Sequence, residues 1–383
     1  MKLAILTQPL RDNYGGLLQA WALQKTLIEL GHDCIIINRE FIRPEDLPLL
    51  HRLIAKAKLA INILIGRQSR QVELSTEQIA SVRANILQFL TNRYQRISPT
   101  IYTKSSLQEY VVEENFDGFI VGSDQVWRPL YSPSIGNYYL DFLPPDSKAK
   151  RIAYAASFGV DTWEYTSKQT KKCATLAHRF DLITVRESSG VNLVKEYLNA
   201  TAVHVSDPTM LLSREAYENL INKPSVPIEN SSGQLFCYVL DSSVGLSSAI
   251  QACAKAMNYK TYYCNALRKI ESAEDLQHLE ECVFPPVEQW LKSFHDAEMV
   301  ITDSFHGTVF SIIFNRPFWV ITNKARGESR FTSLLETFGL NNRIVRDLSK
   351  VNWNEPIDWN TVNKLRREFA DKSREYLANI LNK

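Results

Sequence analysis

Short apolar runs alternate with helical patterns through the first 38 residues of the chain. KLAILT (2–7) predicts a buried strand, and RDNYGG (11–16) after it is rich in turn-forming residues. The apolar residues of LLQAWALQKTLIEL (17–30) have a helical spacing, Gly31 marks the end of this helix, and DCIIIN (33–38) predicts a second strand. Two strands joined by a helix predict a parallel sheet and therefore an α/β fold.

The same alternation continues along the chain and falls into two parts. Apolar runs predict four further strands, FDGFIVG (116–122), RIAYAASFG (151–159), DLITVRE (181–187) and TAVHVSDP (201–208). NKPSVPIENSSGQ (222–234) concentrates Pro, Ser, Asn and Gly, so we predict a linker there. Strands and helices alternate again from LFCYVLD (235–241) to PFWVIT (317–322).

This division predicts two α/β domains of comparable size. We expect an N-terminal domain over residues 1–221, a linker over 222–234, a C-terminal domain over 235–356 and a closing amphipathic helix over 357–383. Two Rossmann-like domains usually face each other across a cleft, and ligands bind at the carboxyl ends of the strands. The loops that follow the strands are therefore the candidates for function.

Composition narrows the class of protein. Apolar residues at 45% and charged residues at 22% are typical of a folded globular protein, and the net charge of +2 gives no reason to expect a nucleic-acid partner. The six cysteines are scattered, mostly in apolar stretches and without a C-x-x-C pair. We therefore expect buried free thiols in a reducing compartment.

The location of the protein is predicted from two stretches near the start of the chain. MKLAILTQPL (1–10) has the pattern of a strand rather than of a signal peptide, and no apolar run approaches the roughly 18 residues of a membrane span, so we expect a cytoplasmic protein. Residues 49–70 combine an apolar helical face with basic side chains, and such a helix can bind the inner face of a membrane peripherally. Packing against the protein's own core is the alternative, which the pattern favours.

Several common functional motifs are missing from the sequence. It contains no G-x-x-x-x-G-K-[ST] phosphate loop, no G-x-G-x-x-G fingerprint, no G-x-S-x-G elbow and no H-E-x-x-H. It also contains no D-x-D pair, and its seven histidines are dispersed. We therefore predict no obligatory metal and no cofactor.

Two strand-to-helix junctions in the N-terminal half carry polar side chains. In DNYGGLLQAW, Gly15 and Gly16 allow a ligand to approach the N–H groups at a helix start, and Asn13, Tyr14 and Gln19 add hydrogen-bonding groups. The alternative is a tight turn without a ligand.

The second junction is IVGSDQVWRP. Ser123, Asp124 and Gln125 follow an apolar strand, and amides, carboxylates and an aromatic face suit sugar binding. The alternative is a helix N-cap at Ser123 or Asp124, with Trp127 packed in the core.

Basic residues follow two other strands. Arg186 in ITVRESSG could grip a carboxylate or phosphate with two parallel hydrogen bonds, or form a salt bridge with a nearby carboxylate. In TNKARGESRF, Lys324, Arg326 and Arg330 could bind an anion or lie in a solvated loop, and Arg330 is the better candidate because an apolar helix follows it.

His306 in VITDSFHGTVFS is the candidate for catalysis. Ser304 ends the strand, His306 is expected in the loop, and Gly307 and Thr308 are expected to lead into the helix. An imidazole can donate or accept a proton near neutral pH. The N–H groups at the start of the following helix could bind the same anionic ligand as the imidazole. A single histidine is usually structural, but this position favours function.

Six segments together resemble one known family. In chain order they are NYGGLLQAWALQKTLIELGHD, FDGFIVGSDQVWRP, AYAASFG, ITVRESSG, VSDPTMLL and DSFHGTVFSIIFNRPF. This ordered set is similar to the polysaccharide pyruvyl transferase family and covers most of residues 1–345. The resemblance implies a GT-B-like fold and transfer of the pyruvyl unit of phosphoenolpyruvate to two hydroxyls of a sugar, with release of phosphate. The acceptor would be a sugar or lipid-linked oligosaccharide, as a precursor of a cell-surface polysaccharide or exopolysaccharide.

The resemblance also implies roles for individual residues. The donor site would use Arg186 and the stretch Ser304, Phe305 and His306, followed by Gly307. Better-known members of the family have an arginine where this chain has Ser304, so either Arg330 or Lys324 supplies one charge or the donor differs. The acceptor would lie against the N-terminal domain, at Asn13, Tyr14, Gly15, Gly16, Gln19, Ser123, Asp124 and Gln125.

Two other functions stay open at this stage. A metal-independent GT-B-like glycosyltransferase would need similar cations for the diphosphate of a nucleotide sugar. A non-catalytic glycan-binding member of a polysaccharide assembly system would bind sugar without releasing phosphate.

Overall fold

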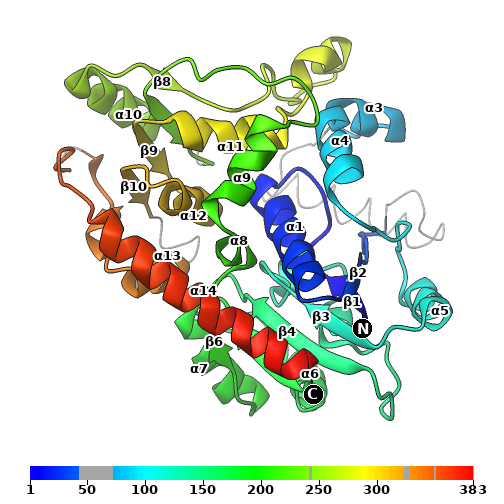
Figure 1. Ribbon diagram of the computed structural model, residues 1–383. Coiled ribbons are helices and arrows are strands. Elements are labelled where there is room, and N and C mark those ends of the chain that lie inside the picture. Colours follow the sequence, from blue (N-terminus) through cyan, green and yellow to red (C-terminus); the bar gives the residue numbers. More distant parts are fainter. Residues whose placement is uncertain (43–71, 241–243, 323–327, 349–350, 383) are drawn as a thin grey trace.

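The computed structural model of the protein describes residues 1–383 except 43–71, 241–243, 323–327, 349–350 and 383 (Figure 1). The basic helix expected over 49–70 lies outside the described residues, and so do Lys324 and Arg326. Within the described part, no helix is long and apolar enough to cross a membrane. All six cysteines are described, and each is buried and unpaired, as the sequence predicted.

The first sheet has six parallel strands in the order β2-β1-β3-β4-β5-β6. Their bounds are β1 Lys2–Leu6, β2 Asp33–Ile36, β3 Gly118–Val121, β4 Lys150–Ala156, β5 Leu182–Val185 and β6 Val203–His204. Strands β1 and β3 are buried along nearly their whole length because helices cover both faces of the sheet. The strand order reverses between β1 and β3, which makes the loops after these two strands the expected place for a ligand.

Helices and short 3-10 turns connect these strands. They are α1 Tyr14–Glu29, α3 Thr76–Val82, α4 Ala84–Arg93, α5 Lys104–Glu114, η2 Pro129–Tyr131, η3 Ile135–Tyr139, α6 Ser167–Ala177 and α7 Ser188–Leu198. Helix α1 begins at Tyr14, three residues earlier than its apolar spacing predicted, because the side chain of Asn13 caps it by accepting from the Gly16 N–H. Gly31 follows the helix with a φ of +88°, a conformation that suits glycine, so the predicted helix end is confirmed.

The second sheet has five parallel strands in the order β11-β10-β9-β7-β8. The strands are β7 Leu235–Tyr238, β8 Thr261–Tyr262, β9 Met299–Thr302, β10 Phe318–Ile321 and β11 Ile344–Val345. The connecting elements are α10 Val244–Met257, η4 Glu274–Cys282, α11 Val287–Asp296, α12 Phe305–Ile313, α13 Ser329–Thr337 and η6 Asn341–Arg343. Here the order reverses between β7 and β9, so the loops after these two strands are a second expected place for a ligand.

A continuous apolar core joins the two sheets. Tyr14 of α1 stacks on Trp290 of α11 with ring centroids 5.6 Å apart, and Phe310 of α12 packs edge-on against Tyr217 of α9 (Arg214–Asn222) at 5.0 Å. Burying a large apolar side chain stabilises a fold by about 1.5–3 kcal/mol. These contacts therefore pack helices of the first half of the chain against helices of the second half.

The last helix returns to the first sheet. Helix α14 (Trp359–Leu381), red in Figure 1, starts beside the second sheet and packs against α8 (Pro208–Leu211). Ser373 on α14 accepts a hydrogen bond from the Ser206 N–H at 2.9 Å, and Arg374 donates to the Leu211 carbonyl oxygen at 3.2 Å. The expected closing helix is therefore present, and it supports the segment that follows β6.

Candidate active site

A cavity of about 500 Å³ lies where the reversal points of the two sheets face each other. Residues from the loops after β1, β3, β7 and β9 line it, together with Arg330 from the start of α13. The described lining residues are Asp12, Asn13, Asp124, Gln125, Arg128, Tyr131, Tyr238, Leu240, Asp303, Ser304, Phe305, His306 and Arg330. We call this space the central cavity.

Helix α12 brings His306 to the central cavity. Ser304 caps the helix by accepting from the Gly307 N–H at 3.4 Å, and α12 begins at Phe305. We predicted from the sequence that His306 lies in a loop and that the helix begins near Thr308. This prediction was wrong, because the cap at Ser304 starts the helix earlier. His306 lies in the first turn and is 6% exposed.

Two glycines leave the space that this arrangement needs. A Cβ built at Gly307 would lie 2.2 Å from Oγ1 of Thr302, so only glycine lets α12 pack this closely on β9. A Cβ built at Gly15 would lie 2.2 Å from Nδ1 of His306. Gly15 therefore makes room for the imidazole ring at the start of α1. Gly16 is also in this first turn, where its N–H is bound by Asn13.

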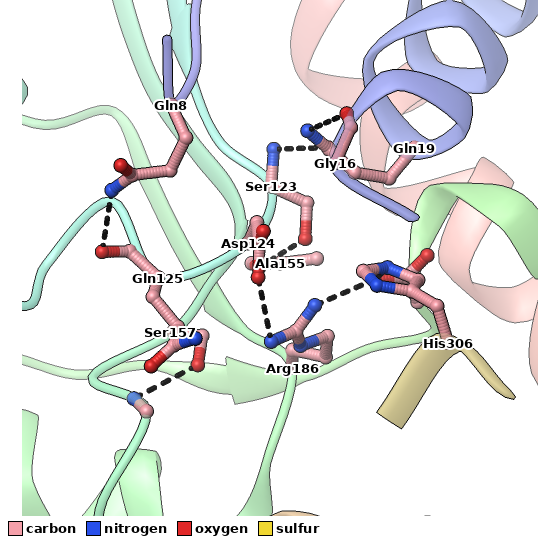
Figure 2. Close-up of polar contacts among 12 residues, drawn as sticks. Gln8, Gly16, Gln19, Ser123, Asp124, Gln125, Ala155, Ser157, Arg186 and His306 are labelled. Atoms are coloured by element: carbon pink, nitrogen blue, oxygen red, sulfur yellow. Dashed lines mark hydrogen bonds and ion pairs between the residues drawn. The ribbon is translucent and has the colours of Figure 1, made fainter. Parts of the chain in front are cut away.

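Arg186 sits in a buried network of carboxylates. Its guanidinium donates to Asp124 at 3.2 Å (Figure 2). It also donates to Asp207 at 3.1 Å, and its Nε lies 3.9 Å from Glu187. It also stacks over the Phe305 ring at 4.1 Å. Burial lowers the pKa of Arg186, but the three carboxylates outweigh burial and raise it above its ordinary value. The salt-bridge interpretation of this arginine is therefore the one that the structure shows.

Asp207 connects this network to His306. One carboxylate oxygen, Oδ2, lies 3.1 Å from Arg186 and 3.6 Å from Nε2 of His306. The other, Oδ1, accepts from the Thr209 N–H at 3.0 Å and from the Thr209 hydroxyl at 2.6 Å. Burial raises the pKa of Asp207, but His306, Arg186 and Thr209 together lower it below its ordinary value. Asp207 is therefore a buried carboxylate held between Arg186 and His306.

Two cations from other elements reach the central cavity. Arg128 donates to both oxygens of Glu164 at 2.9 Å, and this bidentate contact raises the pKa of Arg128. Burial lowers the pKa of Arg330, and the neighbouring Arg186 lowers it further, against the opposite effect of Glu187 and Asp124. Arg330 and Ser304 line the same cavity. Arg330 therefore brings a cation to the cavity that Ser304 also lines.

The residues predicted to bind the acceptor divide into two groups. Asn13, Asp124 and Gln125 line the central cavity. Gln19 and Ser123 are fully buried and bind each other, because the Ser123 N–H donates to Oε1 of Gln19 at 3.0 Å.

The partners of these two buried residues explain their position. Gln19 also donates to Thr7 and to the Gly16 carbonyl oxygen, and the Ser123 hydroxyl donates to the Ala155 carbonyl oxygen (Figure 2). Gln19 and Ser123 therefore brace the ends of β1 and β3. Trp127 is fully buried and stacks on Tyr139 at 4.9 Å, so the core alternative holds for this tryptophan.

A second space, which we call the side cavity, adjoins the central one. It measures about 870 Å³ and shares Asp12, Tyr238 and Leu240 with the central cavity. Its other walls come from α3, from residues 264–271 and from residues 282–285. Tyr14 lines it and donates from its hydroxyl to the Pro285 carbonyl oxygen at 2.9 Å. Apolar side chains such as Ile79, Val82 and Phe284 form much of its surface.

Several residues of the site were not predicted from the sequence. They are Asp12, Arg128, Tyr131, Asp207, Tyr238, Leu240 and Asp303. Most of them follow the strands β1, β3, β7 and β9, so the strand ends were the signal that could have found them. Among the described residues, one group of three could surround an ion, namely His278, Glu280 and Glu281, and none of the three lines the central cavity.

Two parallel-sheet domains with a polar cavity between their strand ends define the protein as a GT-B-like two-domain α/β protein. The sequence model of the polysaccharide pyruvyl transferase family matches residues 13–325. The chain therefore belongs to this family and is a transferase. No curated protein matches the sequence.

Several solved structures are similar to this chain at low sequence identity. The S. aureus MnaA–UDP co-structure has a TM-score of 0.50 and 10% identity, covering 100% of this chain and 98% of that chain. The UDP-GlcNAc 2-epimerase from Neisseria meningitidis bound to UDP-GlcNAc has a TM-score of 0.49 and 8% identity, covering 100% and 99%. Arabidopsis thaliana UGT89C1 complexed with quercetin has a TM-score of 0.48 and 11% identity, covering 98% of both chains.

Proposed function

We propose that this chain transfers the pyruvyl unit of phosphoenolpyruvate to two hydroxyls of a sugar in a cell-surface or exopolysaccharide precursor. The observation that carries the proposal is the central cavity of a chain in this family. There His306, in the capped first turn of α12, and Arg330, at the start of α13, line the cavity together with Asn13, Asp124 and Gln125. One wall offers groups for an anion and a proton, and the other offers groups for sugar hydroxyls.

The donor chemistry fits the wall formed by α12 and α13. Phosphoenolpyruvate carries a carboxylate and a phosphate, so it needs cations and oriented N–H groups. The N-terminus of α12 provides partial positive charge, and Arg330 provides a full one. We assign to Arg330 the charge that Ser304 cannot supply. Lys324 stays a proposed donor ligand outside the described residues.

Arg186 acts through its neighbours in this proposal. Its guanidinium is 1% exposed and is already paired with carboxylates, and among the described residues the lining of the central cavity does not include it. Arg186 contacts both Asp124 and Phe305, which do line the cavity. It therefore holds the acceptor wall and the donor wall together.

His306 is the proposed proton donor in a two-stage reaction. It gives a proton to C3 of phosphoenolpyruvate, and the first sugar hydroxyl adds to C2 and loses its own proton. The proton of the first hydroxyl returns to His306. The second hydroxyl then attacks C2, the C2–O bond to phosphate breaks, and the leaving phosphate takes the proton of the second hydroxyl. The products are a pyruvate ketal on the sugar and inorganic phosphate.

The acceptor is proposed to reach from the central cavity into the side cavity. The reacting sugar would lie at Asn13, Asp124 and Gln125, and the rest of the acceptor would lie past Asp12 and Tyr238. The mixed apolar and polar lining of the side cavity suits the faces and hydroxyls of further sugar units. The residues shared by the two cavities support this proposal, because a single acceptor could pass from one cavity into the other.

Thermal unfolding with added ligands tests the proposed donor. Phosphoenolpyruvate at 100 times its dissociation constant should stabilise the fold by about 2.7 kcal/mol. Nucleotide sugars at the same concentrations should give no shift. Stabilisation by a nucleotide sugar and none by millimolar phosphoenolpyruvate, with or without an acceptor glycan, would instead favour glycosyl transfer. Glycan binding without phosphate release would favour a non-catalytic role.

A further inference from the structure

We propose that Asp207 is a positioning residue that keeps a proton on Nε2 of His306 and so leaves Nδ1 as the nitrogen that serves the substrate. This inference rests on the proposed function of His306 as a proton donor. Asp207 belongs to VSDPTMLL, a segment for which no separate role was predicted from the sequence.

The Asp207 carboxylate cannot turn away from His306. Asp207 caps the short helix α8, with Pro208 at the first helical position, and its Oδ1 accepts two hydrogen bonds from Thr209. Its Oδ2 accepts from Arg186 on one side. The remaining side of Oδ2 faces His306 at 3.6 Å. The position of this oxygen is therefore fixed before any ligand binds.

The His306 ring has little choice of partner at Nε2. This nitrogen is buried and has no hydrogen-bond partner at bonding distance within the described part of the chain, and Asp207 is its ion-pair neighbour. Nδ1 lies at the Gly15 main chain. A carboxylate at Nε2 favours a proton there, and a second proton on the ring then sits on Nδ1. The doubly protonated ring is the form that can give a proton to phosphoenolpyruvate.

Other charges around the ring do not replace Asp207. Arg186 contacts the same Asp207 oxygen and so weakens the attraction of that oxygen for the proton on Nε2 of His306. The partial positive charge at the start of α1 disfavours a protonated ring. The other charged groups lining the cavity with His306 are Asp12, Asp124, Asp303, Arg128 and Arg330. None of these five has an ion pair with His306 within the described residues, whereas Asp207 does. The effect on the ring should therefore depend on this one carboxylate.

Asp124 provides a matched control for Asp207. Both carboxylates pair with Arg186 at nearly the same distance, 3.2 Å for Asp124 and 3.1 Å for Asp207, but only Asp207 has an ion pair with His306 among the described residues. Asp207→Asn and Asp124→Asn therefore remove the same kind of partner from Arg186. They differ in what they do to the imidazole.

The experiment is an NMR titration of protein labelled with ¹⁵N in its histidine rings, with the His306 signals assigned by their loss in His306→Gln. At a given pH, Asp207→Asn should lower the ratio of protonated to neutral His306 by at least about tenfold. Asp124→Asn should change this ratio by less than about threefold. An unchanged ratio in Asp207→Asn, or equal effects of the two variants, would overturn the proposal.

A measurement on the unchanged protein covers the case in which Asp207→Asn does not fold. The neutral His306 ring should carry its proton on Nε2, which ¹⁵N shifts distinguish from the Nδ1 form. A neutral ring with its proton on Nδ1 would overturn the proposal without any variant.

Phosphoenolpyruvate binding separates this inference from the proposed function. The folded Asp207→Asn variant should bind phosphoenolpyruvate within about threefold of the unchanged protein and lose turnover instead, as expected of a positioning residue. A loss of more than tenfold in affinity would point to a structural role and overturn the inference. If the unchanged protein binds no phosphoenolpyruvate, the proposed donor fails, and the ring titration still decides the link between Asp207 and His306.

Discussion

Gly15 makes room for the ring of His306 because residue 15 has no side chain. A Cβ there would lie 2.2 Å from Nδ1 and 2.3 Å from Cγ of His306, well inside van der Waals contact. Gly15 is on α1, which follows β1 of the first sheet. His306 is on α12, which follows β9 of the second sheet. A contact between the two domains therefore sets the position of the proposed catalytic ring.

Gly15→Ala should displace this ring and lower turnover. A misplacement of about 1 Å can cost roughly 100-fold in rate, so we expect at least that loss in phosphate release from phosphoenolpyruvate. The matched control is Gly245→Ala in α10, where a Cβ meets nothing within 4 Å. Normal turnover in Gly15→Ala would contradict the assigned position of His306.

Arg330→Ala should weaken phosphoenolpyruvate binding. Hydrogen bonds to charged groups contribute about 1.5–3 kcal/mol, which corresponds to a rise of about 10- to 150-fold in the dissociation constant. Isothermal titration calorimetry would measure it. Arg346→Ala is the control, because Arg346 is exposed and paired with Glu328, away from the cavity lining. Equal phosphoenolpyruvate affinity of the two variants would show that Arg330 does not supply the charge that Ser304 lacks.

His306→Gln distinguishes a proton donor from a phosphate ligand. A positioned acid contributes about 10²–10⁴ in rate, so kcat should fall by that factor while the dissociation constant of phosphoenolpyruvate changes little. His295→Gln on α11 is the histidine control. A large rise in KM at unchanged kcat would show that His306 only binds the donor.

Ala266→Trp should obstruct the side cavity. Ala266 lines this cavity, and a bulky side chain there should raise the KM of an oligosaccharide acceptor at least about tenfold, with phosphoenolpyruvate affinity unchanged. The control is the same change at the next residue, Leu267→Trp, where the side chain is 91% exposed and outside the cavity lining. Equal KM values for the two variants would place the acceptor elsewhere.

Asp207→Asn should also change the acid stability of the protein. Because the pKa of Asp207 is below its ordinary value of about 3.9, its charge stabilises the fold above that pH, and the contribution is lost as pH falls through the lowered value. Breaking a buried ion pair costs about 3–5 kcal/mol. Urea unfolding should show this difference undiminished from pH 7 to about pH 4, and shrinking below.

The control for this pH dependence is Asp161→Asn, an exposed position. It should change the free energy of unfolding by less than about 0.5 kcal/mol at any pH. A difference between Asp207→Asn and the unchanged protein that vanishes by pH 6 would show that the stabilising charge belongs to another group.

Most of the fold could be predicted because its strands are buried on both faces. Runs such as LITV (182–185) and MVIT (299–302) are continuous apolar segments bounded by polar residues, and both form strands. The short strand Ile344–Val345 was missed because two residues carry no periodicity. The start of α12 was missed because apolar spacing hid the cap at Ser304, although a serine just after a strand is itself a helix-start signal.

The site was predicted in part, and the burial of Arg186 shows why. Its position after β5 was correct, but its state depends on Asp124 and Asp207, which are 62 and 21 residues away in the sequence. Local patterns say nothing of such pairs. Asp124 and His306 could be found because each follows a strand, whereas the burial of Gln19 and Ser123 depends on the way β1 and β3 meet.

The path of α14 limits how members of this family can be recombined. The helix comes last in the sequence, yet Ser373 and Arg374 bind the segment that carries Asp207. A chimera that joins the first half of this chain to the second half of a relative would separate that segment from the helix that supports it. A functional exchange should therefore take residues 235–356 alone and keep residues 357–383 from the same parent as residues 1–221.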